Sequence, residues 1–229
     1  MLAMAIGSLA TAAHSQRRDD LVPDVGSRFW IQPAPIPAPS EGRIPVSLRL
    51  VDSIWTEGGP ASPTATEVRF DFDAHFGLDL SGEPRCPTGI HFDIRTPESP
   101  CEKMKFATGK MRFVVAFPDS EPLTVTGRVI AFKTNERTMR IRAYFPAPIT
   151  GEVLIPVRLA RAPGGSIYGL TATASIPRVA GGYGSLVYLG LRFRKGLFSA
   201  ACPEGRLQSR GTTTFTDGSK VSIGALTTC

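Results

Sequence analysis

The sequence predicts an all-β fold: an antiparallel β-sandwich, jelly-roll-like or immunoglobulin-like, with almost no helix. Apolar and polar residues alternate in many short runs, which is the pattern of half-buried strands. Turn residues separate these runs at intervals of roughly ten residues, as in known sandwiches. The 20 prolines and 23 glycines fit tight turns between strands better than they fit helices.

The clearest strand lies between Tyr183 and Pro203. Its side chains divide by alternation into an apolar set and a mostly polar set, the first being Val187, Leu189, Leu191 and Phe193 and the second Tyr188, Gly190, Arg192 and Arg194. A strand of this kind needs a second layer to cover its apolar side. We therefore predict a central strand whose apolar set faces the core.

Similar alternation predicts strands on both sides of this stretch, over residues 46–50, 68–72, 111–117, 123–132, 138–145, 153–159, 167–175, 212–216 and 220–226. Asp217-Gly218 is a strong hairpin signal between the last two. A second hairpin is predicted at Thr134–Glu136. The best candidate for a short helix is Ser99–Lys105.

The N-terminal region predicts an export signal followed by a tether. Residues 1–15 form the predicted signal peptide, since Leu2–Ala13 is uncharged, apolar or small, and too short to span a bilayer. No cationic residue precedes Arg17, so either the start lies upstream or the signal is weak; a buried N-terminal helix is the alternative. Residues 16–43, rich in proline, predict an extended tether. Residues 44–229 are then a single β-sandwich domain, with no stretch long enough for a membrane span.

Four cysteines in a chain with an export signal indicate two disulfides. Three pairings are possible, and we favour Cys86–Cys101 with Cys202–Cys229 because each closes a short loop. Such loops stabilise a fold by about 3 to 3.5 kcal/mol each in the chain-entropy model. A zinc site is the rival interpretation, but no C-x-x-C pair and no nearby histidine supports it.

The order of several motifs resembles a family of secreted, cysteine-containing all-β proteins from actinobacteria. These motifs are Pro45–Leu50, Val68–Asp73, Leu80–Cys86, Gly182–Leu186, Cys202-Pro203 and Phe215–Gly218 before a terminal cysteine. The likeness covers about residues 44–229. It departs from the family between Cys86 and Cys101, where a compact helical turn is usual. The resemblance implies export and an all-β fold, and it implies no activity and no site residues.

Catalytic and metal-binding patterns are sparse. The histidines His14, His75 and His91 have no metal-binding spacing, and no nucleophile elbow accompanies them. The best acidic group is Asp71, Asp73 and Asp79. Asp71 and Asp73 lie on one strand face, about 6.5 to 7 Å apart by strand rise, which suits a hard cation or a pair of catalytic carboxylates. A solvated strand face is the alternative, and we expect no cofactor.

The net charge of +6 is compatible with an anionic partner. Outward arginines recur on two predicted strands, each set with a tyrosine on the same side; together they are Arg140, Arg142, Tyr144, Tyr188, Arg192 and Arg194. If the two strands are neighbours, these residues form a basic face that could bind an anionic polysaccharide or cell-wall polymer. A solubilising sheet face is the alternative. No nucleic-acid-binding motif is present, so we expect no nucleic-acid partner.

We therefore expect an exported, extracellular or envelope-associated protein that is non-catalytic and binds an anionic polymer. Two other functions stay open: a structural, matrix-associated envelope protein, and a carbohydrate-active enzyme of unrecognised type. A deep cleft that placed Asp71 or Asp73 opposite another carboxylate would favour the enzyme. A surface without any groove would favour the structural role.

Overall fold

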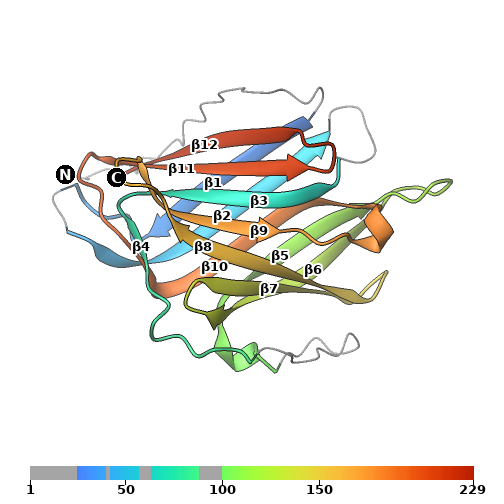
Figure 1. Cartoon of the computed structure of the whole chain (residues 1–229), viewed down its shortest axis with the longest axis horizontal. Helices are drawn as coiled ribbons and strands as arrows, with labels where there is room; N and C mark the ends of the chain where they lie inside the picture. Colours follow the sequence, from blue (N-terminus) through green and yellow to red (C-terminus); the bar gives the residue numbers. More distant parts are fainter. Residues whose placement is uncertain (1–24, 40–41, 57–62, 88–99) are drawn as a thin grey trace, which may run out of the picture.

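The computed structural model describes residues 25–39, 42–56, 63–87 and 100–229. These residues form twelve strands and two short 3-10 turns, with no α-helix among them (Figure 1). The elements are β1 (Val25–Ala34), β2 (Ile44–Thr56), β3 (Ala65–Asp73), β4 (Phe76–Leu78), η1 (Glu102–Met104), β5 (Lys105–Val115), β6 (Leu123–Asn135), β7 (Thr138–Phe145), β8 (Gly151–Arg161), β9 (Tyr168–Ser175), η2 (Ala180–Gly182), β10 (Gly184–Ala200), β11 (Arg206–Phe215) and β12 (Lys220–Thr228). The prediction of an all-β fold is confirmed.

All twelve strands belong to one antiparallel sheet. The strand order is β1-β2-β10-β5-β6-β7-β8-β9-β3-β11-β12, and β4 pairs with β10 outside this path. The two end strands approach each other, since the Thr227 hydroxyl donates a 2.9 Å hydrogen bond to the Ile31 carbonyl. The sheet is thus a nearly closed, barrel-like layer around one core (Figure 1). The prediction of a two-sheet sandwich is not confirmed.

Strand β10 is central, as the sequence predicts. It pairs with β2 on one side and β5 on the other, and Leu189, Leu191 and Phe193 lie in the core. Val187 differs from the prediction because it is only half-buried. The register shifts between Leu186 and Tyr188, so Leu186 takes the inward position instead.

The predicted tether of residues 16–43 contains a strand in its described part. Strand β1 pairs with β2 along its whole length, and it buries Phe29 and Ile31 in the core. Prolines lie close to these apolar residues in the sequence and obscure their period-two alternation, which fits an edge strand. The folded domain therefore begins before residue 44. The predicted signal peptide, residues 1–15, lies outside the described residues.

Both predicted disulfides are confirmed. Cys86 and Cys101 have Cα atoms 5.6 Å apart, and Cys202 and Cys229 have Cα atoms 6.4 Å apart. The first disulfide packs on the outer side of β6 against Phe132, next to η1, which is what remains of the predicted Ser99–Lys105 helix among the described residues. Two disulfides indicate an oxidising environment.

Candidate functional site

The structure separates the two predicted sets of cationic residues. Strands β5 and β6 lie between β7 and β10, so the set on β7 and the set on β10 do not merge into one face. On β7, Arg140 is half-buried opposite Pro156. On β10, Arg194 forms an ion pair with Glu83. The two strands are therefore not neighbours, and the condition for a merged basic face is not met.

Arg142 and Tyr144 do point to the outer side of the sheet, but they are buried. Arg142 is 2% exposed, and its Nε atom lies 2.9 Å from Glu152 Oε2. Its guanidinium lies 5.7 Å from the Tyr144 ring. Ile130, directly opposite Arg142, packs against the Cys86–Cys101 disulfide, so this part of the outer surface is covered. Strand alternation predicts which side of the sheet a side chain points to, but it does not predict whether another segment covers that side.

A different set of cations gathers on β1, β2, β10, β5 and β6, five strands that are neighbours in the sheet. We call it the basic face, and it consists of Arg28, Arg49, Lys110, Arg112, Arg128 and Arg192. All six side chains are exposed, and none forms an ion pair with another described residue. The only acidic residue in these five strands is Asp52, which is buried. Of the residues predicted from sequence, Arg192 belongs to this face and Tyr188 lies beside it.

Like charges face each other directly within the basic face. Arg49 is the cross-strand partner of Arg192, and Lys110 is the cross-strand partner of Arg128. Like charges at such positions destabilise a sheet, typically by a few tenths of a kcal/mol to about 1 kcal/mol. A bound anion would remove this repulsion, because it would supply the charge that the neighbouring strands lack.

Aromatic rings hold two of these arginines in place. The Arg49 guanidinium lies 4.8 Å from the Trp30 ring centroid, and the Arg112 guanidinium lies 5.6 Å from that of Tyr188. Tyr188 lies flat against Gly190, where a Cβ atom would come within 2.4 Å of the tyrosine oxygen. The rings therefore restrict the motion of the guanidinium groups, which lowers the entropy lost when an anion binds.

The predicted acidic group has structural contacts. Both oxygens of Asp71 are hydrogen-bonded: one to Arg69 Nε (2.9 Å) and the Thr171 hydroxyl (2.7 Å), the other to Arg210 (2.8 Å). Burial acts to raise the pKa of Asp71, but the hydrogen bonds from Thr171, Arg210 and Arg69 outweigh it, so the pKa is lowered. The alternative of a solvated strand face does not hold for Asp71, since this residue is fully buried.

Asp73 and Asp79 have separate partners. Asp73 Oδ1 accepts hydrogen bonds from the His75 backbone and lies 2.8 Å from His75 Nδ1, while Oδ2 accepts one from the Gln208 backbone. Asp79 accepts a hydrogen bond from the Ser81 backbone, and hydrogen bonds from the side chain and the backbone of Ser81 lower the pKa of Asp79. Within the described ranges, no three His, Cys, Asp or Glu side chains form a cluster that could hold a metal. His14 and His91 lie outside these ranges.

One acidic residue that the sequence did not single out lies inside the sheet. Asp52 on β2 points into the core, 4% exposed. Its burial raises the pKa of Asp52 to about 7, although hydrogen bonds from the Thr213 side chain and the Ser53 backbone act to lower it. Thr213 lies on β11, so this carboxyl group connects distant strands across the interior.

Comparison with protein-family models, with curated proteins and with solved structures found no match to this chain. No helix in the part of the chain that the structure describes is both long and apolar enough to cross a membrane.

The assignment of the candidate site depends on the geometry of the basic face alone. The signal that could have identified it from sequence is the absence of outward acidic residues from these five strands.

Proposed function

We propose that the protein is exported and binds an anionic polysaccharide or cell-wall polymer through the basic face, without catalysing a reaction. The proposal rests mainly on the pairing of like charges, since Arg49 lies opposite Arg192 and Lys110 lies opposite Arg128. Among the described residues, no acidic side chain forms an ion pair with any of these four cations. A surface that served only solubility would be expected to intersperse both signs of charge.

The shape of the face suits an extended polymer. The cations occupy neighbouring strands, which are spaced about 4.8 Å apart, so successive carboxylates or phosphates along a polymer can each meet a guanidinium or ammonium group. Trp55 adds an aromatic ring at the end of β2; it is 41% exposed and can stack on a sugar ring. The two disulfides support export, since they persist in oxidising compartments. The likeness to secreted all-β proteins supports the same proposal.

Retention on an immobilised acidic polysaccharide such as alginate, eluted with a salt gradient, tests the proposal. The variant Arg49→Ala/Lys110→Ala/Arg192→Ala should elute at clearly lower salt than the wild type, because exposed charges act through water and are screened by salt. The matched control Arg178→Ala/Arg206→Ala/Lys220→Ala removes the same charge from other exposed positions. Equal shifts in both variants would show that net charge alone causes retention and would contradict the proposal.

A further inference from the structure

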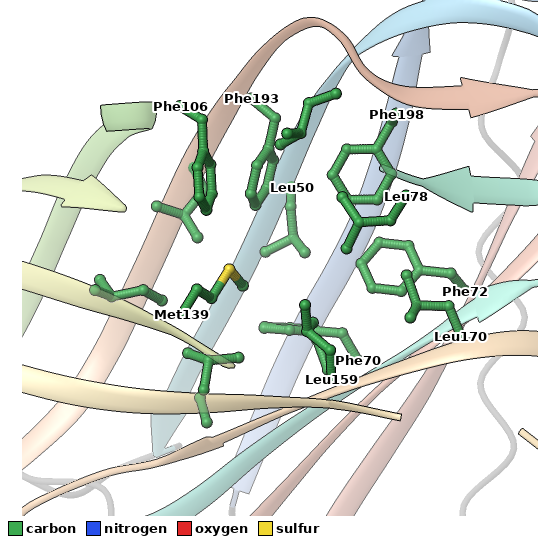
Figure 2. A pocket seen from close by; sticks show the side chains of 16 residues that line it. Leu50, Phe70, Phe72, Leu78, Phe106, Met139, Leu159, Leu170, Phe193 and Phe198 are labelled. Carbon is green, nitrogen blue, oxygen red and sulfur yellow. The ribbon is translucent and has the colours of Figure 1, made fainter. Parts of the chain in front are cut away.

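The barrel-like core contains an apolar cavity that shares part of its lining with a groove at one end of the sheet. Its volume is about 20 Å³, enough for roughly one water-sized sphere. The lining carries no polar side chain, so a water molecule there would lack hydrogen-bond partners. Figure 2 shows the surrounding side chains, with Phe106, Phe193 and Phe198 on one side and Phe70, Met139 and Leu159 on the other.

The cavity arises from small residues on one strand. Ala172 on β9 lies between Phe70 on β3 and Leu159 on β8, and Ala174 follows it on the same inward side. Each alanine contributes only a methyl group where its neighbours contribute larger side chains. The aromatic rings from the opposite wall do not fill the remaining space, so the core is locally less dense than usual.

A wide groove of about 1,250 Å³ lies at the end of the sheet, beside the cavity. The two share three lining residues, Leu78, Leu159 and Leu170. Leu78 is half-buried at the end of β4, which pairs with β10 through Gly77 with Ser199 and Phe76 with Ala200, and the next residue, Asp79, donates a backbone hydrogen bond of 3.0 Å to Leu197 on β10.

The outer part of the groove is cationic. Four arginines line it, namely Arg85, Arg137, Arg158 and Arg161, against two acidic residues, Asp79 and Glu136. Glu136 is already paired with Arg85 and Lys133. Among the described residues, no ion pair involves Arg137, Arg158 or Arg161, so three of the arginines that line the groove have no ion-pair partner there.

We propose that this groove and cavity bind an anionic amphiphile with a single alkyl chain. Its carboxylate or phosphate head pairs with Arg161, which leaves β8 on the same side as Leu159, and Arg158 adds a second positive charge from the other side of the strand. A guanidinium can give such a head two parallel hydrogen bonds. Its chain lies along Leu78, Leu159 and Leu170, and the end of the chain enters the cavity. The gain in free energy comes from removing alkyl carbon from water. This site is separate from the basic face and does not depend on polymer binding.

Isothermal titration calorimetry with the full-length protein tests this proposal. The probes are decanoate and decyl phosphate, which distinguish the two head groups, and decyltrimethylammonium as the cation of equal chain length. We expect at least one of the two anions to bind to one saturable site, and the cation to give no saturable heat. Absence of saturable binding by both anions, or binding of the cation as tight as that of the anions, would overturn the proposal.

Two variants examine the two parts of the site. Arg158→Ala/Arg161→Ala removes exposed charges and should weaken binding at least tenfold. Ala172→Val fills the cavity and should weaken binding at least threefold, with circular dichroism to confirm that the variant is folded. The control Arg49→Ala/Arg192→Ala removes equal charge from the basic face and should bind as the wild type does. If Arg158→Ala/Arg161→Ala or a folded Ala172→Val binds as tightly as the wild type, the proposed site is wrong.

Discussion

Replacing Asp52 with asparagine should change how stability depends on pH. The carboxyl group has an ordinary pKa of 3.8 in the unfolded chain and about 7 in the fold, because burial disfavours its charged form. The folded state therefore holds this proton more tightly. The stability that the protonated group contributes is fully present below about pH 3.8 and is lost as the pH rises to about 7. At 1.36 kcal/mol per pH unit, the loss amounts to about 4 kcal/mol.

Asparagine keeps the size of the side chain and a carbonyl oxygen for Thr213, but it cannot ionise. We expect Asp52→Asn to match the wild type within about 1 kcal/mol near pH 4 and to be more stable by up to about 4 kcal/mol at pH 8. Urea unfolding at pH 4, 6 and 8, followed by tryptophan fluorescence, measures this difference. The control Glu121→Gln removes a negative charge from an exposed loop. A difference between Asp52→Asn and wild type that does not grow with pH would refute the reasoning.

Two further predictions concern the core and the covalent structure. Leu189→Ala on the central strand should lower the free energy of unfolding by about 2 to 5 kcal/mol, because Leu189 is 1% exposed. Val187→Ala should cost less at its half-buried position, and equal urea midpoints for Leu189→Ala and the wild type would contradict the core assignment. Cys202→Ser/Cys229→Ser should lower the free energy of unfolding by about 3.5 kcal/mol, since it opens a loop with a sequence separation of 27. Unchanged denaturation curves for this variant would contradict the role given to the disulfide.

Local features of the fold could be predicted from the sequence. The alternation at Leu189, Leu191 and Phe193 predicted their burial correctly, because the side-chain period of a strand depends only on the strand itself. The short loops between cysteines predicted both disulfides. The strand over Val25–Ala34 was missed because its prolines suggest a tether, although its apolar residues alternate.

The neighbours of a strand could not be predicted in this way. Arg49 and Arg192 are far apart in the sequence, and only the pairing of β2 with β10 brings them face to face. Lys110 and Arg128 meet through the pairing of β5 with β6. Conversely, alternation places Arg142 on the outer side of the sheet, where an exposed residue is expected, yet Arg142 is buried. Burial on the outer side depends on which other segments cover the sheet. Long-range pairing therefore determines the candidate site.

The salt dependence of binding to a soluble acidic oligosaccharide tests the central proposal most directly. The dissociation constant is measured by fluorescence anisotropy at several salt concentrations for the wild type, for Arg49→Ala/Lys110→Ala/Arg192→Ala and for Arg178→Ala/Arg206→Ala/Lys220→Ala. If the basic face holds the polymer, the first variant binds at least tenfold more weakly at low salt and depends less on salt, since fewer ionic contacts remain. The second variant then keeps the wild-type affinity and slope. Wild-type affinity and slope in the first variant would contradict the assignment of the basic face as the binding site.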